Sequence, residues 1–252
     1  MHLTAAGAAL VEGCAEVFGA LDRIETALSG LRGLEAGCLR LAVCTTGKYF
    51  APRLLGEFLR RHPKLEVSLQ IHNRRGLLER LARNEDDLYV FGGRPEAPEV
   101  VCQPILANPL VVLARADHRL AGRRSIPFAE LAQEPFLMRE PGSGTRQAAW
   151  EAFDRHGIAQ TVRMELSTNE AVKQAILAGL GISILPRYTL GLDTEQAQLA
   201  VLDVEGFPLE RQWQFAYPVG KQISPVARAF MDFVRAEAKD LVQAHLGQAA
   251  RR

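Results

Sequence analysis

The stretch from Leu39 to Phe58, LRLAVCTTGKYFAPRLLGEF, constrains the fold more than any other part of the sequence. It begins with an apolar run around Val43, continues with a Thr-Thr-Gly-Lys turn and ends with apolar residues at helical spacing, among them Leu54. This order predicts a strand, a polar turn and a helix. Backbone N–H groups at the start of such a helix lack intrahelical partners, so the turn can hold an anion beyond the carboxyl end of the strand.

The same alternation continues through the first half of the chain. Residues 65–71 and 87–91 are predicted strands, and an apolar pattern from Leu77 to Leu81 predicts a short helix between them. Strands that alternate with helices favour right-handed crossovers and a largely parallel sheet. The polar turns after the strands should then share one edge of that sheet; they are residues 45–48, 73–74 and 92–94.

The second half repeats this order after an interruption. The apolar run Ile105–Arg115 contains Asn108 and Pro109, and a proline there argues against one central strand and favours a crossing between two sheets. The elements predicted next are strands at 135–139, 162–166, 182–185, 199–204 and 212–217 and helices at 147–156, 170–180 and 225–246.

The sequence therefore predicts an α/β fold of two Rossmann-like subdomains joined by a two-strand hinge. The first would comprise residues 37–107 and 207–246, and the second residues 108–206. Ligands in such pairs bind in the cleft between the units, at the carboxyl ends of the strands.

Residues 1–36 are predicted to form a long linker helix with a narrow apolar stripe. The stripe advances in alternate steps of four and three, as in a coiled coil, through Leu10, Cys14, Val17, Leu21, Ile24, Leu28 and Leu31. Packing against the chain's own domain is the alternative. We favour pairing between chains because the stripe is two positions per heptad wide rather than three.

Two strand-to-helix turns that are rich in hydrogen-bond donors should face each other across the cleft and hold a small anionic molecule. The candidate effector-binding residues are Thr45, Thr46, Lys48, Asn73, Arg94, Arg139, Gly142, Ser143, Thr145 and Asn169. Ser143 and Thr145 could instead serve only as helix caps, and asparagine is common in caps and turns. Arg74 and Arg146 also lie in or beside these turns, and at least half of the four arginines should be solvated surface charges.

Several function classes are disfavoured. A net charge of +1 gives no whole-chain reason to expect nucleic-acid binding, so any DNA role must come from a local element. The cysteines and histidines show no metal spacing, and no nucleophile elbow or Walker motif is present, so we expect no cofactor, no metal and no catalytic residue. We find no secretion signal and no apolar run of membrane-spanning length, which favours a cytoplasmic protein.

With these residues in view, the chain resembles the LysR-type transcriptional regulators. HLTAAG at 2–7 is similar to the end of their winged helix-turn-helix domain as it enters the linker helix, and the remainder resembles their periplasmic-binding-protein-like (type 2) effector domain. The segments TTGKYFAPRLLGEFLRRHP, NEDDL and NPLVVLAR resemble the subgroup that regulates Calvin-cycle carbon-fixation operons. Gly47 is a minor departure, since alanine is common there in that subgroup.

The resemblance implies a homodimer or homotetramer in which an effector in the cleft changes contacts with promoter DNA. The recognition helix of the family precedes the region where this sequence starts, so we expect a regulatory fragment that reaches DNA only through that N-terminal domain. Implied effectors are phosphorylated carbon-cycle intermediates or reduced nicotinamide nucleotides. The rival interpretations are an extracellular solute-binding protein, which would need a signal peptide or lipid anchor, and an enzyme on the same scaffold.

Overall fold

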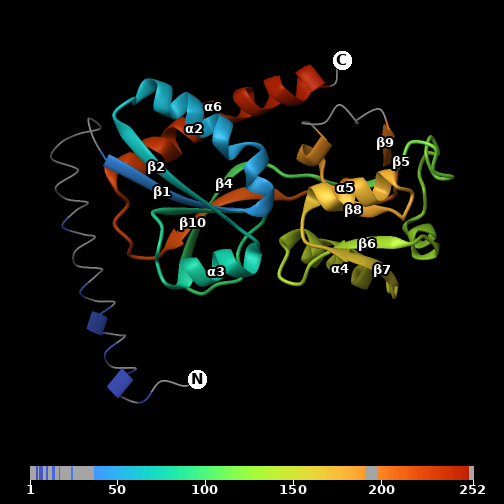
Figure 1. The fold of residues 1–252 in the computed structure, drawn as a ribbon, viewed down its shortest axis with the longest axis horizontal. Helices are drawn as coiled ribbons and strands as arrows, with labels where there is room; N and C mark the ends of the chain where they lie inside the picture. Colours follow the sequence, from blue (N-terminus) through green and yellow to red (C-terminus); the bar gives the residue numbers. More distant parts are fainter. Residues whose placement is uncertain are drawn as a thin grey trace.

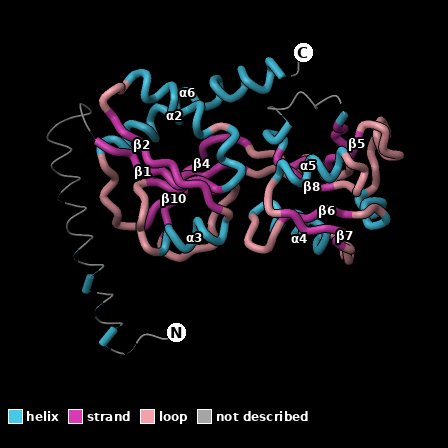
Figure 2. Tube along the Cα trace, in the orientation of Figure 1, coloured by secondary structure: helices cyan, strands magenta, loops and turns pink. Residues whose placement is uncertain are grey.

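The computed structural model describes residues 37–190 and 198–249, with side chains to residue 241, and isolated positions of the N-terminal segment (4, 6, 7, 10, 13, 14, 17 and 24). The strands form a five-stranded sheet in one unit, and a three-stranded and a two-stranded sheet in the other. Figures 1 and 2 show the two units side by side, which confirms the predicted two-unit α/β architecture.

The five-stranded sheet has the order β2-β1-β3-β10-β4. β1 pairs in parallel with both β2 and β3, as predicted, whereas β10 runs antiparallel to β3 and β4. The expectation of a largely parallel sheet is therefore right except for β10, which returns from the other unit instead of following a crossover helix. β4 is antiparallel to β10 and so runs in the same direction as β1, β2 and β3. The strands are β1 Gly37–Cys44, β2 Leu65–His72, β3 Leu88–Phe91, β4 Val100–Ala107 and β10 Gln212–Pro218.

Helices cover both faces of this sheet. α2 and α6 lie on one side and α3 on the other (Figure 1). Aromatic side chains join α2 to α6, since the rings of Phe58 and Phe230 lie 5.2 Å apart, and both are buried with Leu39 and Leu41 of β1. The helical segments of this unit are η2 Thr45–Tyr49, a 3₁₀ helix, and α2 Ala51–Arg61, α3 Arg74–Ala82 and α6 Pro225–Ala249.

In the second unit, β5 pairs antiparallel with β8 and β9, and β6 pairs in parallel with β7. A bridge between Phe136 and Ile182 ties the two small sheets together. α4 begins three residues earlier than predicted because the Ser143 side chain already caps it. The elements are β5 Leu110–Arg115, η3 Phe128–Gln133, β6 Phe136–Arg139, α4 Gly144–Arg155, β7 Val162–Leu166, α5 Asn169–Leu177, β8 Ser183–Pro186, η4 Arg187–Leu190 and β9 Leu199–Leu202.

The chain passes between the units at Asn108-Pro109 and again between β9 and β10. The two crossings are hydrogen-bonded to each other: the Asn108 N–H donates to the Arg211 carbonyl at 2.6 Å, and Leu110 and Leu209 exchange backbone hydrogen bonds of 3.1 and 2.9 Å. The prediction that the proline marks a crossing between two sheets is confirmed.

The described positions of the N-terminal stripe are exposed. Leu10, Val17 and Ile24 are 68%, 60% and 56% exposed, and Cys14 is exposed as well, so these positions do not pack on the chain's own domain. Leu21, Leu28 and Leu31 lie outside the described residues. Within the described part of the chain, no helix is long and apolar enough to cross a membrane.

Gly181 is required where the two small sheets meet. A Cβ at Gly181 would lie 2.2 Å from the carbonyl oxygen of Pro135, and that oxygen already accepts a hydrogen bond from Ile182. We expect Gly181→Ala to lower the free energy of unfolding by about 2–4 kcal/mol, because backbone atoms must move. Urea denaturation measures this change.

Gly56→Ala is the matched control. Gly56 is exposed within α2 and nothing lies within 4 Å of its Cβ position, so the change should leave stability unaltered or raise it by up to about 1 kcal/mol. Equal stability of Gly181→Ala and Gly56→Ala would contradict the predicted clash.

Candidate functional site

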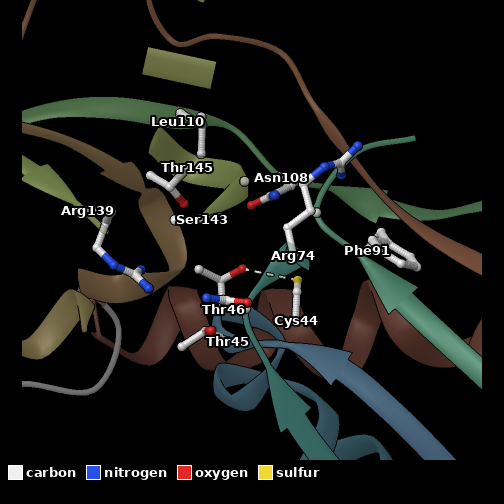
Figure 3. A pocket seen from close by; sticks show the side chains of 13 residues that line it. Cys44, Thr45, Thr46, Arg74, Phe91, Asn108, Leu110, Arg139, Ser143 and Thr145 are labelled. Atoms are coloured by element: carbon white, nitrogen blue, oxygen red, sulfur yellow. Dashed lines mark hydrogen bonds between the residues drawn. The ribbon is translucent and has the colours of Figure 1, made fainter. Parts of the chain in front are cut away.

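A small cavity lies between the two units, beside the first crossing (Figure 3). Its volume is about 30 Å³, which is room for about two water molecules. The wall consists of Cys44, Thr45, Thr46, Asn73, Arg74, Phe91, Gly92, Asn108, Leu110, Arg139, Ser143, Gly144 and Thr145. The turns after β1, β2 and β3 all contribute, so they share one sheet edge as predicted.

The turn after β1 presents two hydroxyl groups to the cavity. The Thr45 hydroxyl donates to the carbonyl of His72 at 3.2 Å, which ties this turn to the end of β2. Thr46 is buried, and its Oγ1 lies 3.5 Å from the sulfur of Cys44 (Figure 3). Burial raises the pKa of the Cys44 thiol, so it stays protonated and serves as a weak hydrogen-bonding partner.

Two cavity residues are also helix caps. The Asn73 side chain accepts a hydrogen bond from the N–H of Gly76 at 3.0 Å, and Ser143 accepts a long one from the N–H of Arg146 at 3.5 Å. A cap satisfies only part of the free N–H groups at a helix start. The beginning of α4, with Gly144 and Thr145 in the cavity wall, therefore keeps donors for an anion.

Arg74 carries the unbalanced charge of the cavity. It is 8% exposed, its Nη2 donates to the backbone carbonyl of Arg94 at 2.8 Å, and its guanidinium lies 5.8 Å from the ring centre of Phe91. Among the described residues no carboxylate pairs with it. Burial, followed by repulsion from Arg211, lowers the pKa of Arg74, and the more distant carboxylates of Glu96 and Glu151 oppose this only in part. A buried cation without a counter-ion is costly, so an anion in this cavity would be stabilised.

Arg139 also lines the cavity, but the protein already neutralises its charge. Its Nε donates to Glu140 at 2.8 Å, and its other nitrogens donate to Asn169 and to the Ser167 carbonyl. Figure 3 shows Arg139 on the opposite side of the pocket from Phe91. With 2% exposure and these partners, Arg139 mainly holds the second unit together at the end of β6.

The structure brings only part of the predicted set together. Thr45, Thr46, Asn73, Arg139, Ser143 and Thr145 line the cavity, whereas Lys48, Arg94, Gly142 and Asn169 do not. Lys48 is paired with Glu170 at 2.7 Å, Gly142 accepts a backbone hydrogen bond from Arg75, and Asn169 is buried against Arg139. Arg94 contributes its carbonyl oxygen to Arg74.

Sequence reasoning selected Arg94 where the structure places Arg74 in the wall. The signal was present, since Arg74 directly follows the cap residue Asn73, but sequence alone does not show which arginine is buried. From the sequence, Asn108 is identified only as the neighbour of Pro109 at the predicted crossing between the sheets. It is 2% exposed, and its Oδ1 has no hydrogen-bond partner among the described residues. The same part of the chain contains no cluster of side chains suited to a metal ion.

A family model described as the LysR substrate binding domain matches residues 32–239. The chain belongs to the LysR family. A RuBisCO operon transcriptional regulator of Acidithiobacillus ferrooxidans is 48% identical over 240 residues, covering 95% of this chain and 78% of the relative. The transcriptional activator CmpR of Synechocystis is 47% identical over 245 residues, covering 96% of this chain and 81% of CmpR.

Solved structures agree with this assignment. The regulatory domain of Synechocystis CcmR, solved in complex with 2-PG, is 48% identical with a TM-score of 0.78, covering 81% of this chain and 98% of that domain. LysR-type regulators bind small-molecule effectors and promoter DNA. The similar proteins are named as transcriptional regulators or activators rather than enzymes, and two of them as regulators of a RuBisCO operon. This LysR-type chain is a transcriptional regulator, and the enzyme alternative is set aside.

Removal of the charge should affect stability much more at Arg139 than at Arg74. Arg139→Met should lower the free energy of unfolding by about 2–4 kcal/mol, because Glu140 and Asn169 lose a buried partner. Arg74→Met should change it by less than about 1 kcal/mol, since it removes an uncompensated charge and keeps the apolar stem. Chemical denaturation of both variants tests this, and an equal loss of stability would contradict the assigned roles.

Proposed function

We propose that this LysR-type regulator senses a small phosphorylated carboxylate in the cavity between its units. The observation that carries the proposal is Arg74, a buried guanidinium with no carboxylate partner among the described residues. A phosphate or carboxylate group would supply the missing counter-charge through charge-assisted hydrogen bonds.

The surroundings of Arg74 favour an anion that touches both units. Arg74 belongs to α3 of the first unit, yet its Cδ would lie only 3.4 Å from a Cβ at Gly144, at the start of α4 in the second unit. An anion beside the guanidinium would therefore also meet the free N–H groups of α4. The Thr46 hydroxyl, whose neighbour is the Cys44 thiol, could donate to a second anionic group, whereas the Thr45 hydroxyl already donates to the His72 carbonyl.

The CcmR domain supports a phosphorylated ligand, since its structure was solved in complex with 2-PG. We infer that the effector here is of similar size and charge, and that carbon-fixation genes are the target, as for the RuBisCO operon regulators. The cavity of about 30 Å³ would have to widen around such a molecule. Widening through the hinge would move residues 37–107 and 207–246 as one regulatory subdomain and residues 108–206 as the other.

Regulation requires the effector to prefer one arrangement of these subdomains, because a ligand that binds both equally shifts no equilibrium. In the proposed scheme, the change in the cleft alters the spacing of subunits in a homodimer or homotetramer in the cytoplasm. Promoter DNA would respond through the winged helix-turn-helix that precedes this region in the family.

Thermal unfolding with a ligand panel tests the effector class. The panel contains 2-phosphoglycolate and 2-phosphoglycerate, both of which are abbreviated 2-PG, together with sugar phosphates, reduced nicotinamide nucleotides and dicarboxylates. A ligand at a hundred times its dissociation constant stabilises the folded protein by about 2.7 kcal/mol, which gives a clear rise in Tm. Stabilisation by dicarboxylates alone would contradict the phosphorylated class.

Arg74→Met then tests the site. We expect the affinity for the stabilising ligand to fall at least about tenfold, because a hydrogen bond to a charged group contributes roughly 1.5–3 kcal/mol. Arg83→Met is the matched control, since the Arg83 side chain is 73% exposed at the end of the same helix. This variant should bind the ligand with unchanged affinity. Titration calorimetry that finds wild-type affinity in folded Arg74→Met would refute the role of Arg74.

Self-association is the other part of the proposal. The exposed stripe at Leu10, Val17 and Ile24 supports pairing of linker helices between chains. Val17→Glu would place a charge in this seam and should raise the dimer dissociation constant at least about tenfold. Sedimentation velocity over a range of concentrations measures the shift, and an unchanged dimer would show that the stripe is not the interface.

A further inference from the structure

The short helix η2 makes contacts with the second unit as well as lining the cavity. Directly after Thr45 and Thr46, Lys48 Nζ lies 2.7 Å from Glu170 Oε2, and the Tyr49 hydroxyl donates to Glu170 Oε1. Glu170 belongs to the first turn of α5, on the opposite side of the cleft. A single carboxylate of the second unit therefore accepts from two neighbouring donors of the first.

The protonation states suit this arrangement at neutral pH. Burial raises the pKa of Glu170, but hydrogen bonds from Lys48 and Tyr49 outweigh it, and the net pKa lies below the usual value. Burial, with hydrogen bonding to Glu170, raises the pKa of Tyr49 far above neutrality, so the phenol remains a donor. The carboxylate therefore stays charged and the phenol stays neutral.

Further contacts cross between the units elsewhere around the cavity. The backbone N–H of Arg75, in the first turn of α3, donates to the Gly142 carbonyl at 3.1 Å, and Gln147 Nε2 donates to Glu96 at 2.8 Å. With Glu170 held by η2 and Arg75 held by Gly142, the space between the walls is only about 30 Å³. These contacts hold the two walls of the cleft together.

We propose that Glu170 is a positioning residue for effector binding: through Lys48 and Tyr49 it holds the η2 turn, and with it Thr45 and Thr46, against the second unit. This inference rests on the proposed function only for its ligand. Glu170 does not line the cavity, so it does not contact the effector. It acts by positioning η2 and by raising the fraction of the free protein in which the contacts between the units are made.

The size of the effect follows from the exposure of the ion pair. The side chains of Lys48 and Glu170 are 29% and 45% exposed. Ion pairs with such exposure change an equilibrium constant by a factor of roughly two to five. The apparent affinity for the effector scales with the fraction of protein in the binding-competent form. Loss of the ion pair should therefore weaken effector binding by no more than this factor of roughly two to five.

The first measurement needs no ligand. Hydrogen exchange at the Arg75 amide reports opening, because its N–H bonds across the cleft to Gly142, far along the sequence from Glu170. We expect Glu170→Gln to speed this exchange about two- to fivefold. Glu165→Gln is the matched control: Glu165 has 46% side-chain exposure and pairs with Arg146 inside the second unit, so exchange at Arg75 should not change.

A double-mutant cycle with Lys48→Met establishes the partner. Both single variants should speed Arg75 exchange, and the double variant should exceed the larger single effect by little, because either change breaks the same pair. The proposal would be overturned if the double variant speeds Arg75 exchange by the product of the two single effects. An unchanged exchange rate in folded Glu170→Gln would overturn it as well.

Calorimetry with 2-phosphoglycolate and 2-phosphoglycerate links the contact to binding. We expect Glu170→Gln to weaken whichever compound binds by two- to fivefold. A loss of a hundredfold or more would indicate direct ligand contact and would overturn the positioning role. If neither compound binds the wild-type protein, the proposed effector class fails, while the exchange experiment still decides the role of Glu170.

Discussion

The hydrogen-bonded pair of chain crossings is the constraint on which the rest of this structure depends. Asn108 and Arg211 are joined through the backbone, and Leu110 and Leu209 are joined one step further into the second unit. Both crossings must bend together, so the relative motion available to the units is a hinge around this short ladder. The same crossing places Asn108 in the cavity wall, which brings the hinge into contact with any molecule held there.

The cationic side chains near the cleft differ in whether a carboxylate pairs with them, and this difference indicates their roles. Lys48 is matched by Glu170 across the units, and Arg139 by Glu140 within one unit, so both charges are already neutralised. Arg74 is the buried case in which no carboxylate pairs with it among the described residues. A count of basic residues in the turns could not distinguish these cases, because the distinction depends on which acidic residue is nearby in the fold.

The sequence was sufficient for the order of elements, the crossing at Pro109 and the shared edge of the polar turns, since these follow from local periodicity and the direction of parallel strands. It was insufficient for β10, whose antiparallel pairing depends on where the returning chain enters the sheet. The site was partly accessible for the same reason: Thr45 and Thr46 follow from the turn, whereas Asn108 becomes a wall residue only through the hinge geometry.

The cavity keeps polar groups that a purely structural core would satisfy. The Asn108 Oδ1 is buried without a hydrogen-bond partner in the described part of the chain, and Arg74 lies in the same wall without a counter-ion. An unpartnered buried oxygen such as the Asn108 Oδ1 costs roughly 1–3 kcal/mol of folding free energy. Apolar residues of similar shape would remove that cost. If the proposed function is right, effector binding recovers part of this cost. The polar groups that destabilise the free protein would then contribute to its affinity for the effector.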